Sequence, residues 1–297
     1  MTTEIRIDAL IPAEMATRAE FVGVRKSEMP FITMFALAIL AGAFIALGAI
    51  FATTVLAGGI SIKDAEGAAA YATALPYGVN RLMAGMVFCL GLILVVVGGA
   101  ELFTGNNLIV MAWASGKVST TALLRNWLIV YLGNFVGSLG TVLVMFFSKQ
   151  YMFSSGAVGL TALNIAKSKV ELGFIQAIAL GIMCNALVCL AVWMTFSARS
   201  TIDKILAIIF PISAFVAAGF EHSIANMYFI PIGLAIKQWA EPKFWESIGK
   251  TAADFSSITW GSFFINNLLP VTIGNIIGGA IFVAAVYWLI FLRPKKA

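Results

Sequence analysis

Six long stretches without a charged side chain dominate this chain, and they restrict it to folding inside a lipid bilayer. The stretches are Phe31–Ile62, Leu82–Ala100, Asn126–Ser148, Leu172–Ala198, Ile205–Phe220 and Phe255–Leu292. Most of them exceed the roughly 20 residues that a helix needs to cross a bilayer. With 61% hydrophobic and 11% charged residues, the chain also has too little polar surface to cover a soluble globule. We therefore predict an all-α integral membrane protein with six transmembrane helices.

The charged residues lie at the edges of these stretches and give a formal net charge of +5. Lys and Arg in such positions are typical of membrane flanks and do not indicate a nucleic-acid-binding surface. The amino-terminal segment contains no apolar run, so we expect no cleavable signal peptide. The distribution of Lys and Arg favours a multi-pass protein of the cytoplasmic (inner) membrane with both termini in the cytoplasm.

Three segments follow from this pattern. Residues 31–293 hold the six spans, and residues 294–297 form a short cytoplasmic tail. Residues 1–30 form a cytoplasmic segment with a partly amphipathic pattern that Pro12 interrupts. This pattern fits a flap over the inner mouth of the protein and, equally, a helix at the membrane surface.

All three cysteines, Cys89, Cys184 and Cys189, lie inside apolar stretches. Their spacing fits neither a disulfide framework nor a metal site, so we expect them to pack in the core. We expect no metal site and no cofactor.

Polar residues interrupt the second and the fifth span with the same pattern. The first break, Gly99–Asn106, and the second break, Gly219–Asn226, both read Gly-x-Glu-x-x-x-small-Asn. The matching positions are Gly99 and Gly219, Glu101 and Glu221, and Asn106 and Asn226. Glycine permits the backbone geometry that a break requires. Because unwound backbone in a membrane must be buried in protein or line a wet cavity, the two breaks predict a substrate path.

Further matches indicate that the chain is a duplicated three-span unit. Val130–Gly137 resembles Val271–Gly278, and Ala36–Ile39 matches Ala177–Leu180 in the right order. The halves cover about residues 31–148 and 170–293. Because three is odd, the second copy enters the membrane from the opposite side, which gives an inverted three-helix repeat.

The only histidine of the chain, His222, lies in the second break. An ionisable side chain is costly to keep in a membrane, so we favour a functional role over a plain hydrogen bond to the interrupted backbone. Asn107–Gly116 and Met227–Ile236 would be half-helices whose amino-terminal N–H groups point inward. Their dipoles favour an anion between them, so we predict a small anion as the substrate.

Three segments resemble the formate/nitrite transporter family: Gly219–Met227, Ala100–Thr104 and Asn267–Asn275. Within this family the chain is most similar to bacterial formate channels, notably through Cys189–Met194 and Pro231–Gly233. The resemblance implies an aquaporin-like fold, although the twin Asn-Pro-Ala signature of water channels is absent. It also implies a homopentamer in the lipid bilayer, with a separate pore in each protomer.

The same resemblance implies roles for residues along the pore. His222 would lie in a central chamber, with Thr104 facing it across the chamber. The cytoplasmic constriction would be formed by Phe88, Leu92 and Phe215, and the periplasmic one by Leu102, Phe103 and Val188. Ordinary apolar packing is the alternative for these six residues.

Further polar residues also receive roles from the resemblance. Asn185 and Asn267 would contact the anion, with bridging between helices as the alternative. Lys169 would draw anions toward the pore, with a simple interfacial anchor as the alternative. We interpret Glu101 and Glu221 as braces for unpaired N–H groups at the breaks, in preference to a direct proton relay.

We therefore expect a channel or transporter for a small monovalent anion. Formate is the first choice, nitrite is the second, and hydrosulfide and lactate fit the same path. His222 would assist by hydrogen bonding or proton transfer, since a neutral acid crosses apolar surface more cheaply than its anion. Passive flow and proton-coupled transport both remain open. A membrane-embedded enzyme is the remote alternative, because the sequence lacks the known metalloprotease, phosphate-loop and nucleophile motifs, and we expect no catalytic residue.

Overall fold

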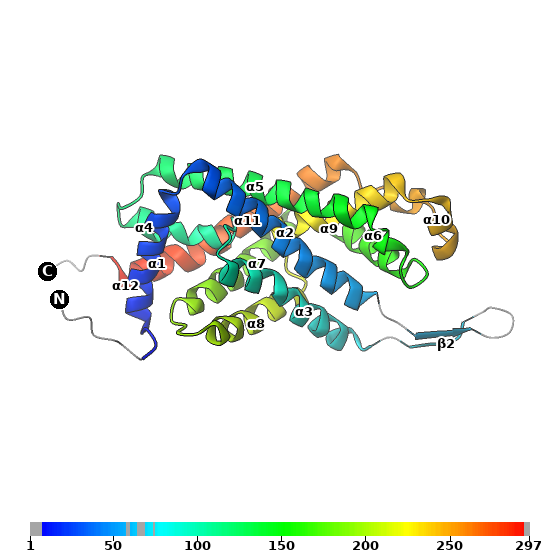
Figure 1. Ribbon diagram of the computed structural model, residues 1–297, viewed down its shortest axis with the longest axis horizontal. Helices are drawn as coiled ribbons and strands as arrows, with labels where there is room; N and C mark the ends of the chain where they lie inside the picture. Colours follow the sequence, from blue (N-terminus) through cyan, green and yellow to red (C-terminus); the bar gives the residue numbers. More distant parts are fainter. Residues whose placement is uncertain (1–7, 58–59, 64–68, 74, 294–297) are drawn as a thin grey trace.

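Long helices make up most of the molecule in the computed structural model, which describes residues 8–57, 60–63, 69–73 and 75–293 (Figure 1). The first elements are α1 (Pro12–Ser27), α2 (Phe31–Leu56), β1 (Ile60–Lys63), β2 (Ala69–Thr73), α3 (Tyr77–Gly98), the 3-10 helix η1 (Gly105–Ile109), α4 (Val110–Ala114), α5 (Thr120–Phe147) and the 3-10 helix η2 (Gln150–Met152). There follow α6 (Ala157–Val170), α7 (Phe174–Thr195), α8 (Thr201–Ala217), α9 (Ser223–Trp239), α10 (Pro242–Ile248), the 3-10 helix η3 (Ala252–Phe255), the π-helical η4 (Ser262–Leu268), α11 (Leu269–Ile276), the π-helical η5 (Ile277–Ala285) and α12 (Val286–Phe291).

Five helices in the described part of the chain are long and apolar enough to cross a membrane. They are α2, α3, α5, α7 and the continuous helix Ser262–Phe291, which combines η4, α11, η5 and α12. Each one overlaps a charge-free stretch of the sequence. The remaining stretch, Ile205–Phe220, lies in α8, which has 17 residues and is followed after a short break by α9, also of 17 residues. The structure thus divides the fifth predicted span into two shorter helices.

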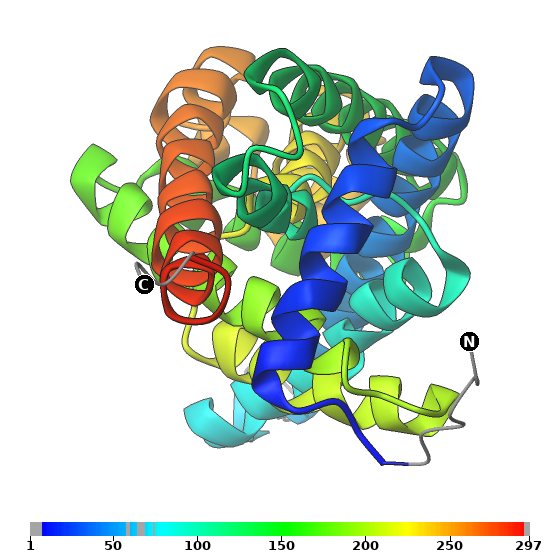
Figure 2. The same ribbon diagram turned by 90° about the vertical axis from the view of Figure 1, so that its left-hand side faces the viewer.

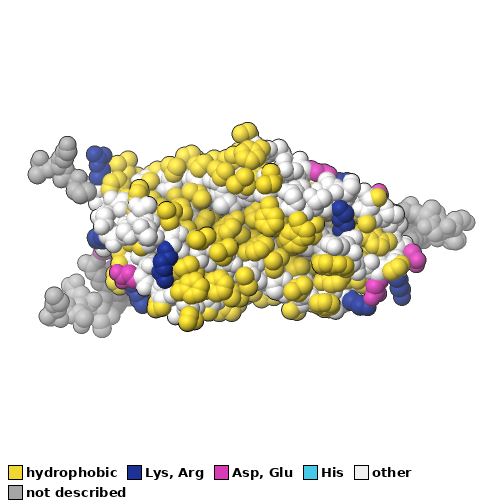
Figure 3. Space-filling view, turned by 90° about the horizontal axis from the view of Figure 1, so that it is seen from above, with side chains coloured by type: hydrophobic (Ala, Val, Ile, Leu, Met, Phe, Trp, Pro, Cys, Tyr) yellow, Lys and Arg dark blue, Asp and Glu magenta, His cyan; other side chains and the backbone are white. Residues whose placement is uncertain are grey.

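An apolar surface covers the middle of the molecule, while charged side chains lie toward its two ends (Figure 3). Large apolar side chains are widely exposed, among them Ile32 at 80%, Ile175 at 75% and Val144 at 67%. An apolar surface of this extent is unfavourable in water and suits contact with lipid tails. The predicted integral membrane protein is therefore consistent with the distribution of side chains.

Both breaks begin at a glycine in the left-handed region, as the sequence predicts. The φ angle is 75° at Gly99, directly after α3, and 76° at Gly219, just after α8. The chain then continues into η1 and α4 after the first break and into α9 after the second. These helices start earlier than the predicted Asn107 and Met227. At the second break the reason is that His222 itself caps the amino terminus of α9.

Glycine residues allow close helix packing in both halves of the chain. A Cβ atom on Gly137 of α5 would collide with the carbonyl oxygen of Ile39 in α2. A Cβ atom on Gly278 of η5 would collide in the same way with the carbonyl oxygen of Ile182 in α7. The contact between α2 and α5 therefore has a counterpart between α7 and η5.

A β-hairpin separates α2 from α3, where the apolar stretch predicts a helix as far as Ile62. Instead α2 ends at Leu56, and β1 pairs with β2 in an antiparallel arrangement. Two successive glycines in the sequence, Gly58 and Gly59, disfavour a longer helix and account for the difference. The hairpin projects from the end of the molecule opposite α1 (Figure 1).

Helix α1 lies across one end of the molecule, beside α12 (Figures 1 and 2). Glu20 of α1 forms an ion pair with Lys117, and the Arg18 side chain donates a hydrogen bond of 3.0 Å to the carbonyl oxygen of Phe196. Helix α1 therefore contacts the segment between α4 and α5 and the turn between α7 and α8. Residues 1–7 of the predicted amino-terminal segment and the predicted tail 294–297 lie outside the described residues.

Candidate functional site

His222 connects the two breaks. Its Nδ1 atom accepts a hydrogen bond of 3.1 Å from the backbone N–H of Ala225 in the first turn of α9. Its Nε2 atom lies 3.0 Å from the hydroxyl oxygen of Thr104 in the first break, although the two residues are 118 positions apart. Both side chains are buried. The sequence-predicted pairing of His222 with Thr104 is thus present in the structure.

The hydrogen bond at Nδ1 determines which ring nitrogen of His222 carries the proton. An N–H group aimed at Nδ1 requires a lone pair there, so the neutral ring has its proton on Nε2. This proton is donated to the hydroxyl oxygen of Thr104. A charged ring would carry a second N–H group, which would face the N–H of Ala225. The geometry therefore favours the neutral ring.

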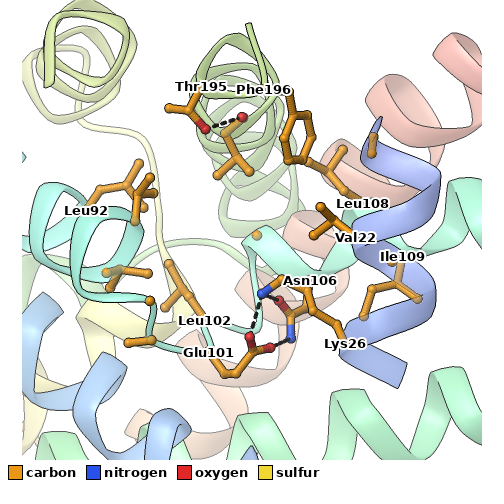
Figure 4. Close-up of a pocket in the computed structure, with 18 of the residues that line it drawn as sticks. Val22, Lys26, Leu92, Glu101, Leu102, Asn106, Leu108, Ile109, Thr195 and Phe196 are labelled. Carbon is orange, nitrogen blue, oxygen red and sulfur yellow. Dashed lines mark hydrogen bonds and ion pairs between the residues drawn. The ribbon is translucent and has the colours of Figure 1, made fainter. Parts of the chain in front are cut away.

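Glu101 braces the first break through both of its carboxylate oxygens (Figure 4). Oε1 accepts a hydrogen bond of 2.7 Å from Lys26 of α1, and Oε2 accepts one of 2.7 Å from the Asn106 side chain. Asn126 of α5 completes the cluster, since it accepts a bond from Asn106 and donates one to the carbonyl oxygen of Lys26. The buried carboxylate is thereby neutralised and held in place.

Glu221 braces the second break with the same arrangement. Oε1 accepts a hydrogen bond of 2.7 Å from Lys169 of α6, and Oε2 accepts one of 2.7 Å from Asn226. Asn267 accepts a bond from Asn226 and donates to the carbonyl oxygen of Lys169. In both breaks the carboxylate oxygens accept bonds from lysine and asparagine side chains, and not from the backbone N–H groups that the glutamates were predicted to brace.

Two further asparagines satisfy the unwound backbone at the breaks. Asn134 of α5 donates to the carbonyl oxygens of Ala38 and Glu101 and accepts from the N–H of Phe103. Asn275 of α11 donates to the carbonyl oxygens of Gly181 and Glu221 and accepts from the N–H of Ser223. The sequence matches contain Asn134 and Asn275, but only the structure shows what they do.

These contacts also correct the alignment of the first span with the fourth. The N–H of Glu101 donates to the carbonyl oxygen of Leu37, and the N–H of Glu221 donates to that of Leu180. Leu37 therefore corresponds to Leu180, whereas the sequence match pairs it with Ile178. The short apolar match contains no polar residue that could fix the register.

Two cavities approach the contact between Thr104 and His222. The α1-side cavity, of about 290 Å³, lies beneath α1 and is lined by charged and apolar side chains that include Arg18, Lys26, Glu101, Leu92 and Leu102 (Figure 4). The α6-side cavity, of about 240 Å³, is lined by side chains that include Arg81, Lys169, Phe88, Phe215 and His222. The brace of the nearby break contributes one lysine to each cavity, and Lys204 of α8 also lines the α1-side cavity.

The six predicted constriction residues do not line the two cavities in the groups that the prediction gave. Leu92 and Leu102 line the α1-side cavity together, whereas Phe88 and Phe215 line the α6-side cavity with His222. Phe88 and Phe215 are in edge-to-face contact, with 5.6 Å between ring centroids. The prediction grouped Phe88 with Leu92 from the family resemblance. Both lie on α3, where one helical turn is enough to carry a side chain from one cavity to the other.

Phe103 and Val188 line neither of these two cavities. The ring of Phe103 packs against Tyr131, with 4.9 Å between centroids, and Val188 is buried in the core. Both residues therefore have apolar neighbours, and their place at a constriction stays a prediction.

The predicted polar contacts also have structural partners. The Asn185 side chain donates to the carbonyl oxygens of Thr104 and Asn275, and Asn267 belongs to the brace of the second break. Neither side chain lines the two cavities, so both bridge helices, which is the alternative that the sequence left open. Lys169 does line the α6-side cavity, but its charge is paired with Glu221.

Sequence reasoning missed Lys26, Asn126 and Arg81. Lys26 and Asn126 are positioned like Lys169 and Asn267, yet the repeat was recognised only from residue 31 onward, so Lys26 had no visible partner. Asn126 directly follows a charged residue at the edge of a span, where an asparagine carries no distinctive signal. Arg81 lies just outside a charge-free stretch and looks like an ordinary membrane flank.

Comparisons with known proteins agree with this arrangement. Residues 13–289 match the family described as formate/nitrite transporter. The chain is 46% identical to the formate channel FocA of Escherichia coli (strain K12) over 295 residues, which covers 99% of each chain. It is 42% identical to the formate channel FocA of Haemophilus influenzae over 92% of each chain. A solved pentameric formate channel with formate bound has a TM-score of 0.80 at 46% identity and covers 89% of this chain and 98% of the other.

Proposed function

The chain belongs to the formate/nitrite transporter family, and we propose that it is a channel that carries formate across the cytoplasmic membrane. The relatives at 46% and 42% identity are formate channels, and both match the chain over nearly its whole length. They are channels and not enzymes, so the anion leaves the protein chemically unchanged.

The observation that carries this proposal is the arrangement of the two cavities around one buried polar contact. His222 lines the α6-side cavity, and its partner Thr104 lies in the chain between Leu102 and Gly105, which line the α1-side cavity. A buried pair of hydrogen-bonding groups next to both cavities suits a small anion that must lose most of its water on the way through. The path runs within one chain, so each protomer carries its own pore.

The overall architecture of the proposal is six spans in an inverted repeat with an aquaporin-like fold. Support comes from the two braces, in which Glu101 and Glu221 have the same kinds of partners at the same positions. In this arrangement α8 and α9 together make the fifth span. We also propose that α1 and α6 are equivalent helices, since each supplies the lysine of one brace. The repeat then begins before residue 31.

We propose that both termini lie in the cytoplasm and that the protein forms a homopentamer. The first and last described helices, α1 and α12, lie at the same end of the molecule, which suits a common side for the two ends (Figure 2). A pentameric formate channel is the solved structure with a TM-score of 0.80 to this chain. Under this orientation the α1-side cavity opens to the cytoplasm and the α6-side cavity opens to the periplasm.

The role of His222 in this mechanism is to donate a hydrogen bond from Nε2. Thr104 accepts that bond when no anion is present, and the anion takes its place during passage. Hydrogen bonding is favoured over full proton transfer, because a proton added to Nδ1 of the ring would remove the lone pair that accepts the bond from Ala225. The hydroxyl group of Thr104 is then free to donate to the same anion.

The test of the proposed function uses purified protein in proteoliposomes. The initial rates of entry of formate, nitrite, hydrosulfide and lactate are compared at equal gradients, with protein-free liposomes as the control. We expect formate to be carried fastest. Faster nitrite flux would assign the chain to the nitrite branch of the family, and the absence of flux for all four anions would contradict the proposal.

A further inference from the structure

Among the described residues, the α6-side cavity contains one cation whose charge no carboxylate neutralises. Lys169 and Glu221 both line the cavity, and their charges cancel in an ion pair of 2.7 Å. Arg81 of α3 lines the same cavity and forms no ion pair with the residues that the structure describes. His222 is neutral in the geometry described above. The net positive charge of the cavity wall therefore comes from Arg81.

The guanidinium group of Arg81 is only partly occupied by hydrogen bonds. Nε donates to the carbonyl oxygen of Ala217 at 3.3 Å, and Nη2 donates to the carbonyl oxygen of Val216. These bonds cap the carboxyl end of α8. A guanidinium group has five N–H donors, and Nη1 has no partner within the described ranges. Backbone carbonyls also carry only partial charge, so the cation keeps most of its field.

The second break leaves this guanidinium group uncovered. Gly219 lies directly beside it, since a Cβ atom at this position would be 3.4 Å from Nη2. The φ angle of 76° at Gly219 also disfavours any residue with a side chain. Arg81 is consequently held against the break from which Glu221 and His222 continue into the pore, and it is half-buried in the cavity wall.

We propose that Arg81 is the docking site for the anion at the α6-side mouth of the pore. A small monovalent carboxylate such as formate binds to Nη1 by charge-assisted hydrogen bonds before it moves on to His222. This inference rests on the proposed transport of formate. It differs from the role implied by the family resemblance, in which Lys169 draws in the anion, because the charge of Lys169 is already used by Glu221.

The test compares Arg81→Gln, which removes the charge, with Arg81→Lys, which keeps it. Formate flux is measured in planar bilayers after insertion in one orientation, with formate added to each side in turn. For Arg81→Gln we expect KM to rise about tenfold from the α6 side and to stay unchanged from the α1 side, with little change in maximal flux. Added salt should raise the KM of the wild type but not that of Arg81→Gln. Arg81→Lys should restore most of the low KM.

A purely structural role of Arg81 would give a different result. If Arg81 only caps α8, Arg81→Gln would lower maximal flux or pentamer content. It would not change how the KM depends on salt. Lys243→Gln is the matched control, because it removes one positive charge from an exposed position on α10, away from the cavity. The proposal is overturned if Arg81→Gln keeps the KM and the salt dependence of the wild type. It is also overturned if Arg81→Lys forms an intact pentamer but does not restore the low KM.

Formate binding can be measured without flux, which separates this inference from the proposed function. Excess formate should raise the melting temperature of the purified wild-type protein, because a ligand that binds only the folded state stabilises it. The increase should be lost in Arg81→Gln and kept in Lys243→Gln. If the wild type carries no formate in bilayers, the proposed function fails, while the melting series still decides the role of Arg81.

Discussion

Tyr131 and Thr272 share a hydrogen bond of 2.8 Å between their hydroxyl groups, and they occupy matching positions in the two copies of the proposed repeat. Tyr131 follows Val130 in the third span, and Thr272 follows Val271 in the sixth. A bond between two equivalent positions lies where the halves meet, on the pseudo-two-fold axis that the proposed repeat requires.

Replacing Tyr131 with Phe should lower the stability of the protein without closing the pore. The variant loses one hydrogen bond between helices, worth about 1 kcal/mol in a membrane, and keeps the ring contact with Phe103. Thermal unfolding in detergent measures the loss. Thr272→Val should cost a similar amount, and the double variant should be no worse than either single one. Additive losses would show that the two residues act independently.

Replacing His222 with Phe should lower formate flux about tenfold or more and leave the pentamer intact. The substituted ring fills the space beside Phe215 but has no N–H donor for the anion. Formate flux is measured in proteoliposomes, and assembly is followed by size-exclusion chromatography. Unchanged formate flux in a correctly assembled variant is the result that excludes this role.

Thr104 should matter through its hydroxyl group. Thr104→Val keeps the shape of the side chain but removes the hydroxyl group that would donate to the passing anion. The loss of such a charge-assisted bond, about 1.5–3 kcal/mol, corresponds to roughly tenfold or more in formate flux. Thr104→Ser keeps the hydroxyl group and should stay within about twofold of the wild type. Equal flux in the two variants would mean that the contact is only structural.

Loss of charge at Glu221 should be more damaging than the same change at Glu101. Each Glu→Gln substitution leaves a lysine unpaired, but the Lys169 side chain is 14% exposed and the Lys26 side chain is 27% exposed. We expect Glu221→Gln to cost about 3–5 kcal/mol and Glu101→Gln less, because water reaches Lys26 more easily. Melting temperatures of the two purified variants test the order, and Lys169→Met should partly rescue Glu221→Gln.

Helix packing in the first half should be sensitive to Gly137 and insensitive to Gly140. An added methyl group at Gly137 collides with the carbonyl oxygen of Ile39, whereas one at Gly140 meets nothing within 4 Å. Gly137→Ala should therefore cost about 1–3 kcal/mol through forced separation of α2 and α5. Gly140→Ala is the matched control on the same helix. Yields of folded protein and melting temperatures give the comparison.

The two breaks could be predicted from sequence because their chemistry is unusual for a membrane. Glu101, Asn106, Glu221 and Asn226 stand in otherwise apolar surroundings, and polar residues in such places are kept only for a reason. Gly99 and Gly219 also carry a backbone requirement that few other residues meet. The positions of these six residues therefore followed from spacing alone.

The position of an apolar side chain along the pore could not be predicted in this way. Phe88 and Leu92 are both apolar residues on one helix, and only the placement of the surrounding helices assigns them to different cavities. The braces show a similar limit. Lys26 and Lys169 reach their glutamates from helices outside the long spans, where a lysine is equally typical of a membrane surface.

The two braces have a consequence for how the chain could be divided. Every side-chain partner of Glu101 lies between α1 and α5, and every one of Glu221 lies between α6 and η4. The contacts of His222 with Thr104 and of Tyr131 with Thr272 are among those that join the two halves. A cut in the segment between α5 and α6 would therefore sever no brace. Each fragment would retain the means to neutralise its own buried carboxylate before it meets the other.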